Sequence, residues 1–412
     1  MKVLWITNIL FPEAAAVLTG NKELKSSGGW MLGAANQLVS RDDVNLCVAS
    51  VSSQVGDLKR IDGNKITYYI LPSKKRDYAN NWIAVNEEFC PDVVHIYGTE
   101  SSHGRAYIKA CGFSNVVISI QGLLSACDYY YCYGLNILDI YKNITLRDLL
   151  KGTILKQQKY FRRCAKYELD MIESVPYIIG RTSWDRAKIW AINPKAKYYC
   201  CNEILRPEFY DGSCWSYDKC FPYSIFISQA NYPIKGFHQL LKAMPLILRH
   251  FPHTTIRVAG FNPTECSSLY QRLKLSGYGR YLKRLISKHD LENHIIFLGP
   301  LTAEQMKSEY LRSNVFISPS SIENSPNSLG EAQILGVPCI SSYVGGAMDM
   351  MSNNFENLYR FEDVEMLAFK VCKIFENKGL QVDMSDCAHR RHNMLYNDER
   401  LYGIYKEIIS AR

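Results

Sequence analysis

The sequence predicts an α/β protein with two doubly wound, Rossmann-like domains that face each other across a cleft. Its 412 residues exceed what one hydrophobic core ordinarily holds, so two domains of roughly 200 residues each are expected. Short apolar runs alternate with helix-like segments, which is typical of a mainly parallel sheet covered on both faces. The alternation lapses over 205–223, where Pro, Gly and aromatic residues accumulate, and then restarts. We therefore expect domains at 1–210 and 222–395.

The first domain is expected to contain one early helix and a series of buried strands. The apolar residues of "WMLGAANQLVSR" (30–41), which follow Gly28 and Gly29, fall on a helical period. Short apolar runs that end at Gly, Pro or polar residues predict the strands. These runs are "KVLWITNI" (2–9), "NLCVASV" (45–51), "KITYYIL" (65–71), "PDVVHIYG" (91–98), "NVVISIQG" (115–122), "PYIIGRT" (176–182) and "AKYYCCNEIL" (196–205).

The second domain repeats this rhythm without repeating the sequence. The expected strands are "SIFISQA" (224–230), "TIRVAG" (255–260), "HIIFLG" (294–299), "NVFISPS" (314–320) and "PCISSY" (338–343), and the expected helices are "FHQLLKAMPLILRHFP" (237–252), "LKRLISKHD" (282–290), "TAEQMKSEYLRS" (302–313), "SLGEAQILG" (328–336) and "EMLAFKVCKIFEN" (365–377). Ligands of such sheets bind beyond the carboxyl ends of the strands, so the site is expected in the loops at those ends.

The composition indicates a soluble, globular, cytosolic protein. Hydrophobic residues make up 47% of the chain and charged residues 21%. No apolar run reaches the length of a transmembrane helix, and Pro12 and Glu13 interrupt the first one, which therefore predicts a strand. The 14 cysteines lack CxxC spacing and are interpreted as small buried hydrophobes. Because the nine histidines form no HxxxH or HExxH pair, no metal bound by protein ligands alone is expected.

Part of the net charge of +8 is concentrated in one stretch, 142–168. It contains eight Lys or Arg residues and two acids, a local charge of +6, with leucines and isoleucines at roughly helical spacing. This pattern fits a solvated helix packed on a domain. It also fits a basic amphipathic surface for anionic lipid head groups or a phosphorylated acceptor. Nucleic acid is disfavoured, because no recognition motif accompanies the charge.

The stretch "ENSPNSLGEAQIL" predicts an anion site at the start of a helix. Ser325 suits the N-cap, and Pro326 suits the first helical position, where its missing N–H costs nothing. The next backbone N–H groups then point outward at the positive end of the helix dipole, where a phosphate binds. These groups belong to Asn327, Ser328 and Leu329.

Two glutamates, Glu323 and Glu331, bracket this helix start. A carboxylate beside a phosphate is repulsive unless it binds something else, and a pair of sugar hydroxyls is the natural candidate. A phosphate flanked by two such carboxylates describes a nucleotide sugar. A capped helix with two incidental acids explains the spacing equally well.

Other strand ends carry weaker indications of the same ligand. Lys235 and Gly236, at a strand-to-helix junction in "SQANYPIKGFHQ", suit a diphosphate, which the lysine would meet as a point charge. Gly345 and Gly346 permit close backbone approach to a ligand, although such glycines often mark plain turns. The tyrosine-rich loop 125–141 fits either stacking on acceptor sugars or ordinary packing.

These motifs together resemble the donor half of retaining family-4 glycosyltransferases of the GT-B fold. The resemblance rests on Glu323 and Glu331 within "PSSIENSPNSLGEAQILGVPCISSYVGG", with "YPIKGF" and "IRVAG" before them, and more loosely on "GGW", "PDVVHIYG" and "VVISIQGLL". It is similar to the bacterial polysaccharide-assembly branch. The resemblance implies an acceptor-binding first domain, a nucleotide-sugar-binding second domain and a last helix, 396–412, that crosses back to the first domain.

The resemblance also implies roles for individual side chains. Glu331 would bind the ribose hydroxyls of the donor nucleotide, and Glu323 the hydroxyls of the transferred sugar. Lys235 would supply charge to the diphosphate, with Gly236 beside it. Gln121, in "SIQGL", stands where many relatives have a histidine that contacts the sugar; it can donate a hydrogen bond but cannot take up a proton.

Backbone groups and one further departure complete the implied donor site. The N–H groups of Asn327, Ser328 and Leu329 would meet the diphosphate, and Gly28 and Gly29 would form a loop from the opposite domain. Gln229, in "ISQAN", replaces the arginine of many relatives. Arg181, in "GRTSWDR", is a candidate for restoring positive charge, or equally a surface ion-pair partner.

The implied reaction moves a sugar from a nucleoside diphosphate to a glycan or glycolipid acceptor with retention, without a cofactor or a metal. It is expected in the cytoplasm, and on one reading of 142–168 the protein also contacts the inner face of the membrane there. Two alternatives stay open. One is another enzyme class on the same fold, a nucleotide-sugar epimerase or a phosphorylase, although this chain is short for a phosphorylase. The other is a non-catalytic nucleotide-sugar or glycan-binding protein, which the departures at Gln229 and Gln121 favour.

Overall fold

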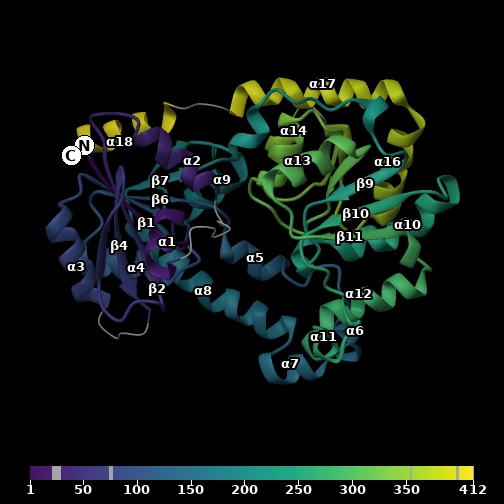
Figure 1. Ribbon diagram of the computed structural model, residues 1–412, viewed down its shortest axis with the longest axis horizontal. Helices are drawn as coiled ribbons and strands as arrows, with labels where there is room; N and C mark the ends of the chain where they lie inside the picture. Colours follow the sequence, from purple (N-terminus) through teal and green to yellow (C-terminus); the bar gives the residue numbers. More distant parts are fainter. Residues whose placement is uncertain (21–28, 74–77, 353–354, 396–398, 412) are drawn as a thin grey trace. The chain divides into compact units, whose positions relative to one another are not determined.

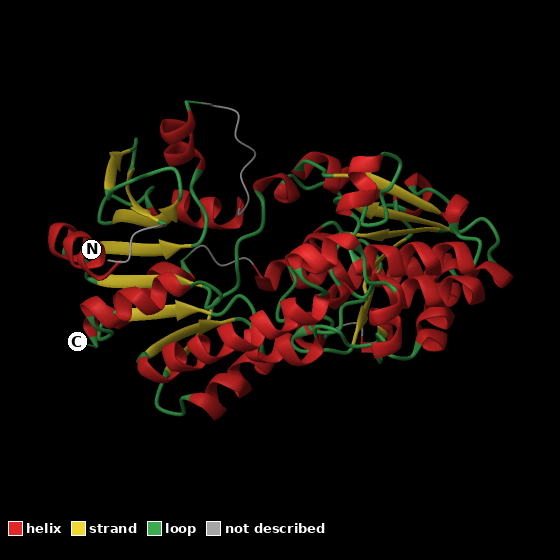
Figure 2. Cartoon of the chain, turned by 90° about the horizontal axis from the view of Figure 1, so that it is seen from below, coloured by secondary structure: helices red, strands yellow, loops and turns green. Residues whose placement is uncertain are grey.

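The computed structural model describes residues 1–20, 29–73, 78–352, 355–395 and 399–411, without the side chains of 29, 30, 78 and 387–395. The chain divides into two compact units. Unit 1 comprises Met1–Ser125, Arg163–Arg206 and Tyr396–Arg412, and unit 2 comprises Ala126–Arg162 and Pro207–Leu395. Each unit contains one mainly parallel sheet with helices packed on it (Figures 1 and 2). The predicted class of two parallel-sheet α/β domains is therefore confirmed.

The sheet of unit 1 has eight strands, and all neighbours are parallel except β3 and β4. In spatial order they are β3 (Lys59–Asp62), β4 (Ile66–Pro72), β2 (Asn45–Ser52), β1 (Lys2–Thr7), β5 (Val93–Tyr97), β6 (Val116–Ser119), β7 (Tyr177–Gly180) and β8 (Lys197–Cys200). The chain order reverses between β1 and β5, because β1 pairs with β2 on one side and β5 on the other. Only the short antiparallel edge strand β3 was not predicted.

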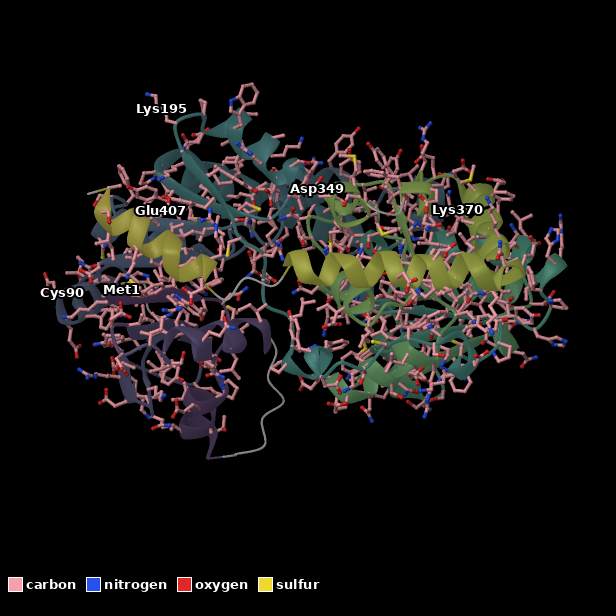
Figure 3. All side chains as sticks on the ribbon, turned by 90° about the horizontal axis from the view of Figure 1, so that it is seen from above. Met1, Cys90, Lys195, Asp349, Lys370 and Glu407 are labelled. Atoms are coloured by element: carbon pink, nitrogen blue, oxygen red, sulfur yellow. The ribbon has the colours of Figure 1, made fainter. Side chains whose placement is uncertain are left out.

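Helices cover the sheet of unit 1, and the last helix of the chain is one of them. The helices are α1 (Pro12–Thr19), α2 (Gly29–Leu38), α3 (Tyr78–Phe89), α4 (Ser102–Cys111), the second half of α8 (Ile154–Ser174), α9 (Ser183–Ile192) and α18 (Arg400–Ser410). The Trp5 indole N–H donates to the Tyr405 hydroxyl over 2.9 Å, which joins α18 to β1. Figure 3 labels Glu407 on this helix, where it pairs with Lys197 over 3.3 Å.

Two buried histidines make the fold sensitive to acid. His95 lies between the Tyr405 and Ser119 hydroxyls in unit 1, at 2.5 and 2.6 Å, and His238 is buried in unit 2. Burial lowers the pKa of each imidazole to about 3. In the unfolded chain a histidine has a pKa of about 6.5, so the unfolded chain binds more protons between these two values. Stability is therefore full above pH 6.5 and is lost as the pH falls toward 3.

We expect the free energy of unfolding to be lower at pH 5 than at pH 7.5 because both imidazoles must become protonated on unfolding. Urea titrations followed by far-UV circular dichroism at these two pH values measure the difference. His238→Gln should reduce it, since glutamine does not titrate. An equal free energy of unfolding at both pH values would contradict the expectation.

The sheet of unit 2 has six parallel strands. In spatial order they are β11 (Ile295–Gly299), β10 (Thr255–Ala259), β9 (Ser224–Ile227), β12 (Val315–Ser318), β13 (Cys339–Ser342) and β14 (Leu358–Tyr359). The α-helices are α5 (Leu124–Tyr130, which starts in unit 1), α6 (Ile137–Lys142), α7 (Leu146–Lys151), the first half of α8, α10 (Phe237–His250), α11 (Leu269–Lys274), α12 (Gly277–Lys288), α13 (Ala303–Arg312), α14 (Asn327–Ile334), α15 (Ala347–Met350), α16 (Val364–Glu376) and α17 (Lys378–Leu395). The 3₁₀ turns are η1 (Pro207–Tyr210), η2 (Tyr217–Lys219), η3 (Pro233–Lys235), η4 (Glu292–His294) and η5 (Phe355–Asn357).

Unit 2 includes a segment, 126–162, that the sequence analysis assigned to the first domain as part of 1–210. Leu135 and Ile154 pack against the hydrophobic core of unit 2. The Arg280 guanidinium of α12 donates to the Ile144 carbonyl oxygen, just after α6, over 3.2 Å. The Arg284 guanidinium donates to the carbonyl oxygen of Lys142, the last residue of α6, over 3.3 Å. The assignment missed this because periodicity identifies a helix but not the sheet against which its apolar face packs.

Candidate functional site

The candidate site of unit 2 lies at the carboxyl ends of β9 and β12. Strand β9 pairs with β10 on one side and with β12 on the other, so the chain order reverses between β9 and β12. Ligands of doubly wound sheets bind at such a point. The loops that leave these two adjacent strands carry Lys235 and Glu323, which are 88 positions apart in the sequence.

Lys235 and Glu323 form an ion pair at this point. The Lys235 Nζ lies 2.6 Å from the Glu323 Oε1, and the Ser320 hydroxyl donates to the same oxygen over 2.7 Å. Burial acts to lower the pKa of the Lys235 amine, but the charge and hydrogen bond of Glu323 outweigh burial and raise it. Lys235 is therefore a protonated amine at neutral pH. The two residues predicted to bind a diphosphate and a sugar are thus in direct contact.

Gly236 allows the Lys235 loop to approach the β12 loop. It ends η3 in the left-handed region at φ 68°, which favours glycine. A Cβ atom at this position would lie 1.6 Å from the Pro319 carbonyl oxygen. Only glycine fits so close to this backbone, and the contact sets Lys235 against the loop that carries Glu323.

Gly345 and Gly346, which follow β13, lie against the backbone of the loop that carries Glu323. The Gly346 N–H donates to the Glu323 carbonyl oxygen over 3.0 Å. A Cβ atom on Gly345, which has φ 49°, would lie 1.9 Å from that oxygen. The close backbone approach expected at these glycines is therefore directed at Glu323 itself.

Helix α14 begins one residue later than the sequence predicts. Its first residue is Asn327, and Pro326 occupies the N-cap with an extended ψ of 118°. The Ser325 hydroxyl lies 3.6 Å from the Met350 sulfur and caps no helical N–H. The prediction of Ser325 as N-cap is wrong, because Pro326 itself has an extended backbone and takes the N-cap position, which leaves Ser325 outside the helix.

The helix start offers fewer backbone donors than expected. The Leu329 N–H already donates to the Pro326 carbonyl oxygen over 3.0 Å, and Leu329 is buried. Asn327 and Ser328 are half-buried in the first turn. An anion at this end of α14 would therefore meet the backbone at Asn327 and Ser328 before Leu329.

Glu331 lies one turn further along α14 and is buried. Its carboxylate Oε2 is 3.4 Å from the Tyr310 hydroxyl, which donates more closely to the Ser328 carbonyl oxygen, over 2.9 Å. The side chain of Tyr310, on α13, is thus a positioning group for the first turns of α14 that the sequence analysis missed. Nothing in the spacing of an isolated tyrosine could have indicated it.

The tyrosine-rich segment lies beside the same site. The Ser321 hydroxyl donates to the Tyr130 carbonyl oxygen over 2.9 Å, and the Lys242 amine donates to the Gly134 carbonyl oxygen over 3.1 Å. Cys127 is close enough to Lys235 to contribute to its raised pKa. The sequence left both stacking on acceptor sugars and ordinary packing open for this segment. In the structure it packs beside the loop of Lys235 and Glu323.

The predicted side chains of unit 1 lie beyond β6 and β7. The Arg181 guanidinium donates to the Gln121 carbonyl oxygen over 2.8 Å and pairs with Glu203 over 3.0 Å. The Arg181 side chain is only 6% exposed, so its charge belongs to a buried ion pair. The Gln121 Nε2 is buried without a hydrogen-bond partner among the described residues, which leaves a donor available at this strand end.

Gly28, Gly29 and Gln229 were also predicted to belong to the site. Gly28 lies outside the described residues, and Gly29 is the first residue of α2. Gln229 is half-buried two residues beyond β9. The structure therefore groups Lys235, Glu323, Glu331 and Asn327 in unit 2.

Glu100 is a further candidate that the sequence analysis missed. It follows β5, at the point where the strand order of unit 1 reverses, and accepts a hydrogen bond from Asn8 over 3.0 Å. Burial raises the pKa of its carboxyl group. A carboxyl group with a raised pKa at such a point is a candidate functional group. The short motif "YGTE" after a predicted strand could have indicated it.

The described residues contain neither a cluster of metal ligands nor a helix that could span a membrane. No group of three or more His, Cys, Asp or Glu side chains there is arranged to hold a metal ion. In the same part of the chain, no helix is both long and apolar enough to span a membrane.

Comparison with known proteins assigns the larger part of unit 2 to a family. The family described as "Glycosyl transferases group 1" matches residues 218–391, which include Lys235, Glu323 and Glu331. These residues form a glycosyltransferase group 1 domain. The matched stretches of the curated relatives cover only 26% to 36% of those proteins' lengths.

The chain is similar in sequence to two curated glycosyltransferases and in fold to a solved structure. An uncharacterized glycosyltransferase of Methanocaldococcus jannaschii is 26% identical over 160 residues, 38% of this chain and 36% of that protein. The UDP-Gal:alpha-D-GlcNAc-diphosphoundecaprenol alpha-1,3-galactosyltransferase of Escherichia coli is 25% identical over 101 residues, 24% of this chain and 26% of that protein. The sucrose-phosphate synthase of Thermosynechococcus elongatus aligns over 100% of both chains with a TM-score of 0.71 and 14% identity. The last likeness concerns the fold, which is GT-B.

Proposed function

We propose that the chain is a retaining glycosyltransferase that moves a sugar from a nucleoside-diphosphate sugar to an acceptor hydroxyl. The observation that carries this proposal is the contact between Lys235 and Glu323 at the start of α14, within a glycosyltransferase group 1 domain. A cation and a helix N-terminus suit the diphosphate of a donor, and the carboxylates of Glu323 and Glu331 suit the hydroxyls of its sugar and its ribose. The UDP-Gal named in the E. coli relative is a donor of this chemical class.

The proposed donor contacts follow from the geometry of unit 2. The Lys235 amine binds the diphosphate through its positive charge, and the backbone N–H groups of Asn327 and Ser328 bind it at the positive end of the α14 dipole. Glu323 accepts from hydroxyls of the transferred sugar, and Glu331 from the ribose. A bound donor thereby replaces part of the Lys235–Glu323 contact with its own phosphate and hydroxyl groups.

The proposed chemistry depends on the departure of the diphosphate. As the glycosidic bond breaks, negative charge grows on the leaving phosphate oxygen, and Lys235 and the α14 start stabilise it without reorganisation. We propose that the acceptor hydroxyl attacks on the same face and passes its proton to that phosphate oxygen. No divalent metal is required, because the protein supplies the positive charge.

The acceptor is proposed to be a growing, lipid-linked glycan of bacterial surface polysaccharide. The name of the E. coli relative includes a diphosphoundecaprenol-linked sugar as acceptor, which is an acceptor of this kind. Such an acceptor is held at a membrane, so we propose that the protein works at the cytoplasmic face and contacts anionic lipid there. The sequence indicates the basic stretch 142–168 for this contact.

A donor screen tests the function against both alternatives. UDP-, GDP-, ADP- and CMP-sugars are added singly, and melting temperature and donor hydrolysis are followed in parallel, with and without lipid-linked glycan. Transfer that requires acceptor supports the transferase. Conversion of the donor to an epimer or to free sugar without acceptor supports an epimerase. A raised melting temperature with neither reaction supports a non-catalytic binder.

Glu331→Ala is expected to weaken nucleotide binding about 10- to 100-fold, the usual effect of losing hydrogen bonds to a charged acceptor. Isothermal titration with the nucleoside diphosphate found in the screen measures this. Pyrophosphate, which lacks a ribose, should bind the variant and the parent protein equally. Glu365→Ala, an exposed glutamate on α16, is the control. Equal loss for pyrophosphate and nucleotide would contradict the ribose assignment.

A further inference from the structure

Three short helices of unit 2 expose a cluster of large apolar side chains that we call the leucine ridge. Helices α7 and α11 lie side by side, and α6 packs against α12 next to them (Figure 1). Leu149 and Leu150 are 73% and 77% exposed, and Leu269 is 77% exposed. The leucine ridge consists of Leu138, Tyr141, Leu146, Leu149, Leu150, Leu269, Tyr270 and Leu273. Soluble proteins rarely expose so many neighbouring large apolar side chains without a partner.

The leucine ridge is held in place by well-defined local structure. Helices α7 and α11 each begin with a capping box, formed by Thr145 with Asp148 in α7 and by Ser268 with Gln271 in α11. A Cβ atom on Gly277 would lie 2.4 Å from the Asp148 carboxylate, so only glycine lets α7 approach the start of α12 this closely. The leucines therefore face solvent from fixed helices. Their exposure contradicts the simple expectation that the apolar positions of 142–168 all pack inward.

Basic side chains surround the leucine ridge. The positive charges of Lys274, on α11, and Lys151, on α7, both lower the pKa of the Tyr270 hydroxyl, with the Lys274 hydrogen bond as the largest cause. The two acids on these helices are turned away from solvent: Asp148 is buried and Asp139 is half-buried. The exposed basic residues of the surrounding helices are Lys142, Lys151, Lys156, Lys159, Arg272, Lys274, Arg280, Lys283 and Arg284.

We propose that the leucine ridge inserts into the interface of an anionic lipid bilayer while the surrounding lysines and arginines bind the lipid head groups. Exposed leucines within a basic rim are the combination that binds such a surface, because the apolar groups enter the acyl boundary and the cations meet the phosphates. This deepens the proposed function by naming the surface that brings the chain to a lipid-linked acceptor. The sequence indicated only the basic stretch 142–168 for lipid binding. The surface proposed here also includes α11 and the exposed apolar side chains, and it belongs to the donor-binding unit.

The charge of the rim favours lipid over a protein partner or a second copy of the chain. Two copies meeting ridge to ridge would bring the like charges of Lys151 and Lys274 together, which opposes association. The part of this stretch that belongs to unit 2, 142–162, contains six Lys or Arg residues and one acid, a local charge of +5, and instead complements a surface that is negative everywhere. A planar membrane also suits apolar groups that protrude, whereas a protein partner would need a matching groove.

The test is co-sedimentation of the full chain with vesicles of phosphatidylcholine alone and with 30% phosphatidylglycerol, at about 0.1 and 0.5 M salt. One variant carries Leu149→Ser, Leu150→Ser and Leu269→Ser, and another carries Lys151→Glu and Lys274→Glu. The matched controls are Phe369→Ser and Lys373→Glu on α16, which are also exposed. Circular dichroism verifies folding, and nucleotide affinity is measured on every variant.

The parent protein should bind anionic vesicles more tightly than neutral ones, and high salt should weaken this binding. Each ridge or rim variant should lose more than about tenfold in vesicle affinity, since each cation near an anionic surface changes binding about fivefold; the controls should not. Absence of vesicle binding, equal loss in the controls, or a dimer that the leucine variant abolishes would each overturn the proposal. Nucleotide affinity should be the same in all ridge, rim and control variants as in the parent protein. A result that overturns the lipid surface therefore leaves the donor site untouched, and the two proposals can fail separately.

Discussion

Lys235→Ala is expected to reduce sugar transfer by about 10²- to 10³-fold and to weaken binding of the nucleoside diphosphate. Removing one preorganised donor from a developing negative charge usually has this effect. The structure adds a second reason. Without the amine, Glu323 would remain as an uncompensated carboxylate 2.7 Å from Ser320 at the point where phosphate must bind, and it would repel the diphosphate.

The comparison of three variants separates these two causes. Isothermal titration gives donor affinity, and initial rates at saturating donor give transfer. Lys235→Arg should recover part of both, because it keeps the charge. Lys235→Ala combined with Glu323→Gln should bind nucleoside diphosphate better than Lys235→Ala alone, because the repulsion is gone. If Lys235→Ala binds and transfers like the parent protein, Lys235 does not contact the diphosphate.

Glu168→Ala is expected to lower the free energy of unfolding of unit 1 by about 3–5 kcal/mol, because each buried donor that loses its acceptor costs about 1–3 kcal/mol. Glu168, on α8, is fully buried. Its carboxylate accepts hydrogen bonds from the Thr99 hydroxyl at 2.5 Å and the Leu124 N–H at 2.9 Å, and from the N–H and hydroxyl of Ser125 at 3.1 and 3.0 Å. Alanine would leave all four donors without their acceptor. Two of these donors are the first backbone N–H groups of α5, so the start of this helix would lose its hydrogen bonds to α8.

Equilibrium urea unfolding followed by far-UV circular dichroism measures this loss. Glu173→Ala is the matched control, because Glu173 is an exposed glutamate near the end of the same helix. Glu168→Gln should be intermediate, since its amide oxygen still accepts two of the bonds. A change below about 1 kcal/mol, the scale of an ordinary surface substitution, would show that water or rearrangement replaces the carboxylate.

Most strands of both sheets could be predicted from the sequence because burial imposes a local pattern, whereas β3, β14 and the helices α1, α3, α4 and α9 were not predicted. Runs such as 2–9 and 224–230 are continuously apolar in their middle, over 3–6 and 225–227, as is typical of strands covered on both faces. The position of Lys235 and Glu323 at strand ends followed from the same pattern. The start of α14 was misplaced by one residue, because Ser325 and Pro326 both have the chemistry of a helix start and only their backbone angles distinguish them.

Long-range relations were beyond the reach of local patterns. That Lys235 contacts Glu323 depends on the pairing of β9 with β12, across 88 residues of sequence. That Gly345 supports the Glu323 carbonyl depends on β13 lying next to β12. The buried pair of Arg181 and Glu203 is of the same kind, since the sequence offered Arg181 either as a cation of the site or as a surface ion-pair partner and did not indicate Glu203.

The sequence by itself determined the two-sheet architecture and the chemistry at the strand ends, because apolar periodicity and residue type are local properties. Only the tertiary structure decided that the segment 126–162 joins unit 2, that it brings Tyr130 to the donor loop, and that it turns Leu149 and Leu150 toward solvent. An amphipathic pattern states that a helix has an apolar face. Which surface covers that face, or whether any does, depends on packing between residues that are distant in the chain.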